Sequence, residues 1–159
     1  MLQIHFYGFD FPRTHCKCVA VDFGGNVAVV GNRAEQEVWR VSVRSPFDAE
    51  KTIGKFKITS GAVAVSGDYE RYFEKDGVRY HHILSPFDGY PSRHMRSVAV
   101  YAASAAEADM LSTALFVMGE DKAKAFKNES GLDFAFVMTM ADGKSLVNDS
   151  ANIFTPGRG

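Results

Sequence analysis

The sequence is poor in cysteine and in long apolar runs, and each shortage excludes a class of protein. Only two of the 159 residues are cysteines, Cys16 and Cys18. Thiols two positions apart do not readily bridge each other, and no second cysteine pair completes a zinc site. Reduced thiols are therefore favoured, with a weak metal cluster involving His15 as the alternative. No apolar run approaches the roughly 20 residues that span a bilayer, and no signal-peptide pattern opens the chain. We expect a soluble, cytoplasmic chain without a transmembrane segment.

The chain also lacks an excess of either charge. Its 18 basic and 19 acidic side chains leave a net charge of −1, so nothing attracts nucleic acid or an anionic membrane. The content of 46% apolar and 23% charged residues is that of a globular protein. The 13 phenylalanines suit a dense core or a pocket for a flat ligand. We expect one globular domain with a real core and no nucleic-acid partner.

Short apolar stretches separated by Gly, Pro and Asp turns predict many strands and few helices. We expect strands over 18–23, 27–30, 38–44, 56–60, 62–66, 69–73, 78–84, 97–102, 132–140 and 145–147. Ser104 with Glu107 forms a capping box that predicts a helix over 105–118. Gly119 is expected to end this helix, and a second consecutive helix follows over 120–129. The predicted fold class is α+β with a mainly antiparallel sheet.

This pattern also predicts how the chain is organised. Residues 1–16 mix aromatics, Pro and His without a period and are expected to be an irregular lead-in. Residues 17–153 are expected to form a single domain, and 154–159 a flexible tail.

Two polar residues of the first predicted helix could bind a metal. Asp109 and Thr113 stand four positions apart, so their side chains share one helix face. Mg²⁺ takes oxygen ligands, usually one or two carboxylates with phosphate oxygens and water. A structural explanation is also open, because an early Asp favours the helix dipole and Thr can bond back to the preceding turn. Spacing alone does not decide between the two.

Two neighbouring histidines end a predicted strand. His81 and His82 should point to opposite faces, so that one is buried or faces a cleft and the other meets solvent. An imidazole titrates near neutrality and could act as a base. A satisfied polar residue at a strand end is the competing interpretation.

Two glycine turns follow strands and could let the backbone approach a phosphate or a ring closely. They are Gly24-Gly25-Asn26 and Ser66-Gly67-Asp68. No P-loop, dinucleotide-binding fingerprint or nucleophile elbow accompanies them.

Taken in order, six segments resemble the ApbE family, the FAD:protein FMN transferases. They are VDFGGNV at 21–27, VSGDYER at 65–71, DG at 76–77, HILSPFDGYP at 82–91, SV at 97–98 and ADMLSTALFVMG at 108–119. The resemblance covers about residues 18–153 and implies an ApbE-like half domain.

The resemblance implies a Mg²⁺-dependent transfer of FMN from FAD to a Thr hydroxyl of a target flavoprotein, with release of AMP. By the family's motifs, Asp109 and Thr113 would be metal ligands and His82 the catalytic residue. FAD contacts would then come from the glycine turns and the histidine: Gly24, Gly25, Asn26, Ser66, Gly67, Asp68 and His82.

Two departures from the family pattern bear on activity. Ser85 stands where the family's H-I-[IL]-D-P segment has Asp, which removes a carboxylate beside the proposed catalytic His82. The chain also matches only the C-terminal half of a domain about twice its length. We therefore expect a homodimer or a complementing chain. The alternative is a truncated, non-catalytic module that binds a flavin or nucleotide or that self-associates.

Overall fold

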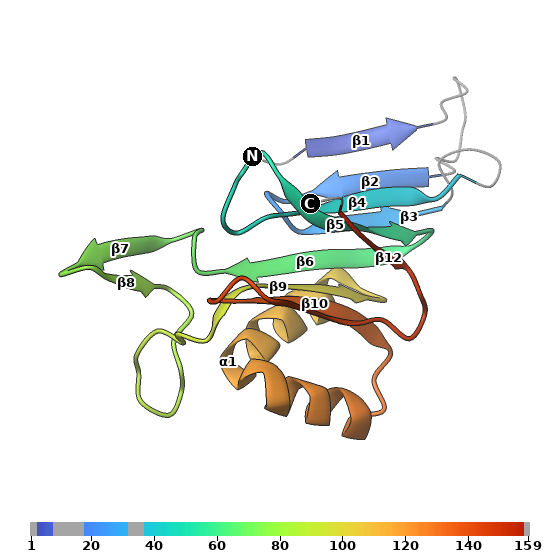
Figure 1. Cartoon of the computed structure of the whole chain (residues 1–159). Helices are drawn as coiled ribbons and strands as arrows, with labels where there is room; N and C mark the ends of the chain where they lie inside the picture. Colours follow the sequence, from blue (N-terminus) through green and yellow to red (C-terminus); the bar gives the residue numbers. More distant parts are fainter. Residues whose placement is uncertain (1–2, 8–17, 32–36, 158–159) are drawn as a thin grey trace.

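The computed structural model describes residues 3–7, 18–31 and 37–157. Within these ranges the chain forms twelve strands and one helix (Figure 1). The strands are β1 (Gln3–Tyr7), β2 (Cys18–Asp22), β3 (Val27–Val30), β4 (Trp39–Arg44), β5 (Thr52–Ile58), β6 (Gly61–Gly67), β7 (Tyr72–Lys75), β8 (Val78–His81), β9 (Met95–Ala102), β10 (Phe134–Met140), β11 (Ser145–Asn148) and β12 (Phe154–Pro156). The helix is α1 (Ala105–Glu129).

The centre of the fold is a seven-stranded sheet in the order β1-β2-β3-β6-β9-β10-β11. A three-stranded sheet, β12-β5-β4, and the β7–β8 hairpin complete the strands. Every strand pair among the described residues is antiparallel. The predicted class, a mainly antiparallel sheet with helix, is confirmed.

Both faces of the central sheet are covered, by α1 on one side and by the small sheet on the other. In β9, Val98 and Val100 belong to the core beneath α1, whereas the intervening Ala99 belongs to the core beneath the small sheet. Successive side chains of a strand point to opposite faces. A strand covered on both faces is therefore apolar throughout, and all three residues are 0% exposed.

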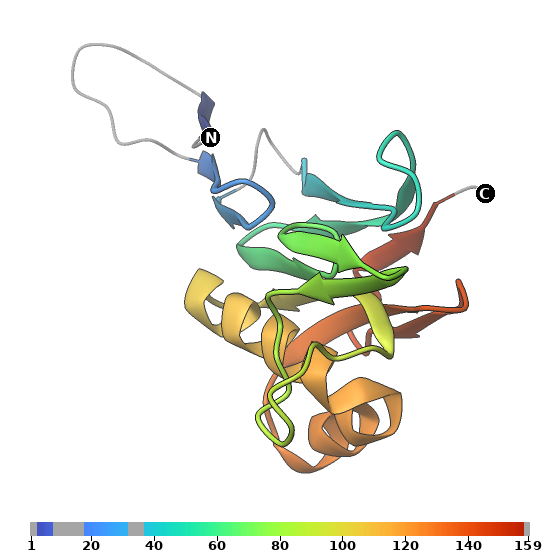
Figure 2. The ribbon, with the colours of Figure 1, turned by 90° about the vertical axis from the view of Figure 1, so that its left-hand side faces the viewer.

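The expectation of two consecutive helices is wrong, because the described residues form a single helical element, α1. Only Gly119 inside α1 leaves helical geometry, with φ 76° and ψ 178°. The helix changes direction there (Figure 2), yet no connecting loop separates its two parts. The position of Gly119 in the sequence correctly indicated where the direction changes. A glycine kink, however, does not require the chain to leave the helix for a loop.

Strand pairing also reaches segments that were expected to be irregular. Within the predicted lead-in, β1 pairs with β2, and within the predicted tail, β12 pairs with β5. Neither segment has a clear apolar period, so pairing with a partner strand, and not local sequence, decides its conformation. Most other strand boundaries lie within a few residues of the prediction, while β7 begins three residues later than expected. His15 and Cys16 lie outside the described residues, and Cys18 is buried.

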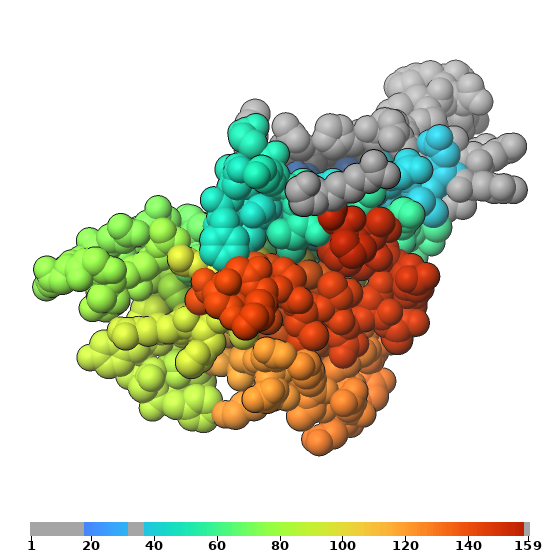
Figure 3. Space-filling view, viewed as in Figure 1, coloured from blue at the N-terminus to red at the C-terminus, as the bar shows by residue number. Residues whose placement is uncertain are grey.

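Turn chemistry explains the β7–β8 hairpin, which projects from the body of the molecule (Figure 3). Asp76 and Gly77 form a two-residue loop with φ values of 52° and 72°. Positive φ at both loop positions is the type I′ geometry that matches strand twist. The predicted hairpin turn is therefore confirmed.

No helix among the described residues has the length and apolar character that crossing a membrane requires.

Candidate functional site

The helix and one of the glycine turns meet through a single side chain. Asn26, in the turn between β2 and β3, donates from Nδ2 to Asp109 Oδ1 at 2.8 Å. Its Oδ1 accepts from the Val65 N–H of β6 at 3.2 Å. The amide of Asn26 therefore joins the turn, the central sheet and the carboxylate predicted to bind metal.

Three hydroxyls extend this connection toward Thr113. Ser66 Oγ, on β6, lies 2.8 Å from Ser112 Oγ and 3.0 Å from Thr113 Oγ1. Ser112 and Thr113 each donate to the Asp109 carbonyl, at 2.9 and 3.3 Å. The structure thus brings together four predicted site residues, namely Asn26, Ser66, Asp109 and Thr113.

Sequence reasoning missed Ser112 at this site. Ser112 is fully buried where α1 packs on β6, and its hydroxyl bonds Ser66. The signal was a small polar residue on an otherwise apolar helix face, next to Leu111 and one turn before Leu115 and Phe116. Such a residue needs a buried partner.

The donor set is compatible with a hard cation. Asp109 and Thr113 are exposed, and together they offer a carboxylate oxygen and a hydroxyl whose lone pairs can accept. In the part of the chain that the structure describes, no group of three or more His, Cys, Asp or Glu could hold a metal. A cation here would need water or phosphate oxygens as well, and this is usual for Mg²⁺.

Gly24 and Gly25 are organised by a carboxylate. Asp22 Oδ1 accepts from both backbone N–H groups, at 2.8 and 2.9 Å, and the two glycines have φ values of 80° and 117°. These N–H groups are therefore already bonded and could bind a phosphate only if Asp22 moved. Both glycines line a cavity of about 380 Å³, with Tyr69 among the other lining residues.

Tyr69 lies against the second glycine turn. A Cβ on Gly67 would come within 2.5 Å of the Tyr69 ring, so the absence of a side chain at 67 lets the ring approach. Burial, followed by the nearby Glu70 carboxylate, raises the pKa of Tyr69 to about 12. The phenol is therefore protonated at neutral pH.

Asp68 belongs to a separate ionic cluster. It is 5% exposed and is ion-paired with Arg96, while its Oδ1 lies 3.6 Å from Arg79 Nη1. Between described residues, no hydrogen bond or ion pair joins Asp68 to Asp109 or Thr113. Because a buried carboxylate needs compensating charge, these arginines give Asp68 a structural role.

The two histidines face opposite environments, as predicted. His81 is 6% exposed, and its Nε2–H donates to the Ser92 carbonyl at 2.8 Å. Its Nδ1 accepts from the Ile83 N–H at 3.3 Å, so both ring nitrogens are satisfied. His82 is exposed, and its Nδ1 lies 3.3 Å from the Arg71 carbonyl. Because a carbonyl only accepts, Nδ1 carries the proton in this contact, and Nε2 keeps a free lone pair.

Ser85 takes over a turn-forming role that an aspartate could also fill. Its hydroxyl accepts from the Phe87 N–H at 3.3 Å, the bond by which Asp or Ser begins a side-chain turn.

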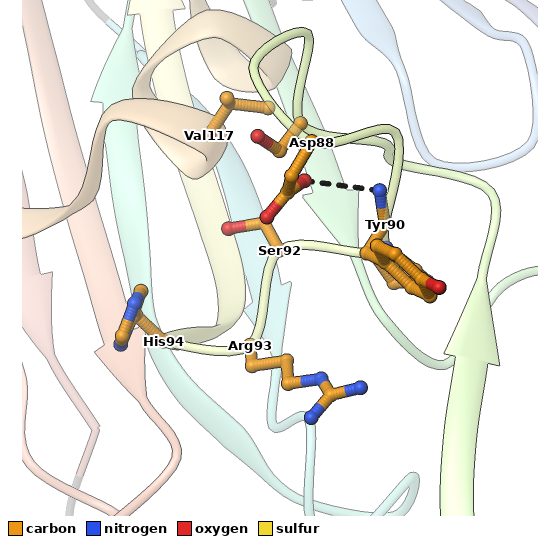
Figure 4. Close-up of a pocket in the computed structure, with 8 residues that line it drawn as sticks. Asp88, Tyr90, Ser92, Arg93, His94 and Val117 are labelled. Carbon is orange, nitrogen blue, oxygen red and sulfur yellow. Dashed lines mark hydrogen bonds between the residues drawn. The ribbon is translucent and has the colours of Figure 1, made fainter.

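Figure 4 shows the cavity that this loop borders, with the Asp88 carboxylate bonded to the Tyr90 N–H at 3.0 Å. That bond, with a weaker one from Ser85, holds the pKa of Asp88 below its usual value. The cavity measures about 450 Å³ and is lined also by Ser92, Arg93, His94 and Val117.

Structural comparison defines the class of protein to which this fold and site belong. The ApbE protein from Thermotoga maritima superposes with a TM-score of 0.76 at 40% identity, covering 82% of this chain and 42% of that protein. The apo flavinyl transferase ApbE from Pseudomonas stutzeri gives a TM-score of 0.65 at 31% identity, covering 89% of this chain and 45% of that protein. The fold is that of the flavinyl transferases.

Comparison of the sequence with known proteins leads to the same class as comparison of the structure. A FAD:protein FMN transferase from Treponema pallidum is 38% identical in an alignment 128 residues long, which covers 74% of this chain and 35% of the relative. One from Haemophilus influenzae is 34% identical in an alignment 137 residues long, which covers 82% of this chain and 39% of the relative. The model of the ApbE family matches residues 11–138. The chain belongs to the ApbE family, and it spans less than half the length of these relatives.

Proposed function

We propose that the chain contributes one half of a Mg²⁺-dependent FAD:protein FMN transferase. The hydroxyl of a Thr in an acceptor protein attacks the FMN phosphorus of FAD, the bond from that phosphorus to the bridging oxygen breaks, and AMP leaves. The observation that carries the proposal is the network joining Asn26, Ser66, Asp109 and Thr113, which holds a carboxylate and a hydroxyl beside a glycine turn.

Asp109 and Thr113 would hold the magnesium ion, which supplies charge neutralisation at the pyrophosphate. Asn26 fixes the carboxylate of Asp109 by its 2.8 Å bond, so the carboxylate needs little reorganisation when ligand arrives. Ser66 does the same for the hydroxyl of Thr113. Such preorganisation lowers the barrier because no energy is used to align the ligands.

His82 is the proposed base. Its Nε2 would take the proton that the acceptor hydroxyl loses as the new P–O bond forms. Ser85 leaves this segment without the carboxylate that the family pattern places there, so His82 would act without an anion at that position. His81 cannot replace it, because both of its ring nitrogens are engaged.

The test is an assay with FAD, Mg²⁺ and a Thr-bearing acceptor domain, run with and without the complementing part of a relative. We expect AMP together with an acceptor that carries covalent flavin fluorescence. Asp109→Ala should reduce product formation at least about 100-fold, since losing a ligand also loses preorganised charge stabilisation.

Asp121→Ala is the matched control, because Asp121 is an exposed carboxylate on the same helix and should leave product formation unchanged. Equal losses in both variants would contradict the metal-ligand assignment. No product at high concentrations of both parts would favour the second candidate, a non-catalytic flavin-binding or self-associating module.

A further inference from the structure

The three strands of the small sheet carry positive charge only. Together β4, β5 and β12 contain four basic residues and no Asp or Glu, whereas the whole chain has 18 basic and 19 acidic side chains. A chain that is almost neutral therefore has a local excess of positive charge. We call the four residues the basic face: Arg40, Arg44, Lys55 and Lys57.

The strand register places these charges on the outward side of the small sheet. Arg40 pairs directly with Lys57, and Ser42 with Lys55, and directly paired residues share a face. The residues that alternate with them along both strands are buried in the core against the central sheet. Arg40, Arg44 and Lys57 are exposed, and Lys55 is half-buried. The basic face is therefore accessible to a partner.

The charges of the basic face are not neutralised within the part of the chain that the structure describes. No ion pair or side-chain hydrogen bond there involves any of the four. Like charges directly opposite each other in a sheet are destabilising, and Arg40 lies opposite Lys57. Charged side chains protect an edge strand such as β4 from unwanted pairing, but β5 is the central strand of this sheet. Edge protection therefore does not explain the lysines of β5, whereas an anionic partner would relieve the repulsion.

One edge of the small sheet is open beside the basic face. Among the described residues β4 pairs with β5 only, so alternate N–H and C=O groups of β4 point away from the sheet. Two cavities border this edge: one of about 320 Å³ is lined by residues 39–42, and one of about 380 Å³ by Val41, Ser42 and Arg44. In Figure 1, β4 lies beside β2 and β3, which line both cavities as well. The opposite edge, β12, has three residues and includes Pro156, which has no N–H to donate.

We propose that the basic face and the β4 edge bind an acidic, extended segment of a partner protein. The segment pairs with β4 as an added strand and places carboxylates beside Arg40 and Arg44. Side chains on one face of a strand are two residues apart, so a segment with an acidic residue at every second position matches the basic face. Charge complementarity identifies this occupant, and the inference is independent of the proposed function.

Two other anionic partners fit these observations less well. Single-stranded nucleic acid stacks its bases on aromatic rings, but the aromatic residues of these strands, Trp39, Phe56 and Phe154, are all buried in the core. A bilayer surface offers no strand to pair with β4. Nor do the three strands have an exposed large apolar side chain that would insert among lipids.

The experiment measures the binding of synthetic peptides to the full chain without FAD or metal. The probe is a fluorescein-labelled peptide in which Glu alternates with Thr, and the matched peptide has Gln in place of every Glu. By fluorescence anisotropy we expect the Glu peptide to bind at least about tenfold more tightly than the Gln peptide. Its affinity should fall as sodium chloride rises from about 0.01 M to about 0.15 M, because the screening length falls from about 30 Å to about 8 Å. Amide hydrogen exchange should slow in β4 and stay unchanged in β12.

Lys57→Glu tests the basic face and should bind the Glu peptide at least about tenfold more weakly, because an attraction is replaced by a repulsion. Lys75→Glu is the matched control, since Lys75 is exposed on β7, outside the small sheet, and the net charge changes by the same amount. Its affinity should change less than about twofold. Thermal unfolding checks that Lys57→Glu is folded, and this variant should be at least as stable as the wild type because an acid then lies opposite Arg40.

Equal binding of the Glu and Gln peptides, equal weakening in the two variants, or unchanged hydrogen exchange in β4 overturns the proposal. So does tighter binding, at the same salt concentration, to phosphatidylglycerol vesicles or to single-stranded DNA than to the Glu peptide. A dimer of the chain that Lys57→Glu dissociates would assign the basic face to a second copy and would overturn it as well.

Discussion

At the scale of single residues, the site depends on side chains whose hydrogen bonds cross from one element to another. Asn26 bonds both the β6 backbone and Asp109, so an amide that is local to a turn positions a carboxylate 83 residues away in sequence. Ser66 has the same function for Thr113. Neither contact follows from periodicity, because each depends on how α1 crosses the sheet.

Tyr69 gives a prediction about alkaline stability. Its folded pKa is raised from 10.0 to about 12, so between these pH values the unfolded chain releases the proton and the folded chain keeps it. The stability that this phenol contributes is complete below pH 10 and is lost as the pH rises toward 12. Tyr69→Phe should therefore flatten the loss of stability between pH 10 and 12, measured by urea unfolding.

Tyr90→Phe is the control, since Tyr90 is 59% exposed. The free energy of unfolding of Tyr90→Phe should fall with rising pH as it does in the wild type. An unchanged slope in Tyr69→Phe would contradict the raised pKa.

At the scale of elements, α1 shows how one residue can redirect a helix without ending it. Gly119 combines φ 76° with ψ 178°, a region that is essentially restricted to glycine. Gly119 is buried, and the kink there sets the direction of the second part of the helix.

Gly119→Ala should destabilise the protein by about 1–3 kcal/mol, the cost of holding a residue with a Cβ in this conformation. Space is not the cause, because a Cβ at 119 would have no neighbour within 4 Å. Chemical denaturation measures the loss. Asn128→Ala, at an exposed position of the same helix, should change stability by less than about 0.5 kcal/mol. Equal stability of Gly119→Ala and the wild type would show that the kink is not required.

At the scale of the whole molecule, two cores share the central sheet. One lies under α1 and the other under the small sheet. Phe56 is 0% exposed in the second core, with its ring 5.0 Å from Phe154 and 6.4 Å from Tyr101 between centroids. It therefore contacts both the neighbouring strand β12 and the central sheet.

Phe56→Ala should cost about 3–5 kcal/mol, from lost burial and the cavity that remains. Because total stability is commonly only about 5–15 kcal/mol, thermal unfolding should shift by many degrees. Phe87→Ala, at 86% exposure, should leave the melting temperature nearly unchanged. A small shift in Phe56→Ala would mean that the small sheet contributes little to folding.

Several features could be predicted from the sequence because their causes are local. The capping box at Ser104, the Asp76-Gly77 turn and the alternating pattern of β4 depend on residues close in sequence. The strands β1 and β12 could not, because each is fixed by pairing with another strand and not by a pattern of its own. The predicted site divides in the same way: Asp109 and Thr113 share a helix face by spacing, whereas Ser112 and the separate ionic cluster of Asp68 required tertiary packing.

The sequence by itself determined most of the strands, the helix start and, through six ordered motifs, the resemblance to a family. These features follow from local backbone preferences and residue identity. Only the tertiary structure decided that Asn26 and Ser66 hold Asp109 and Thr113, that His82 and not His81 has a free ring nitrogen, and that one apolar face of β2 and β3 is covered only in part. The contacts of Asp109 and Thr113 join segments far apart in the chain, and the packing of the two cores on the central sheet brings those segments together.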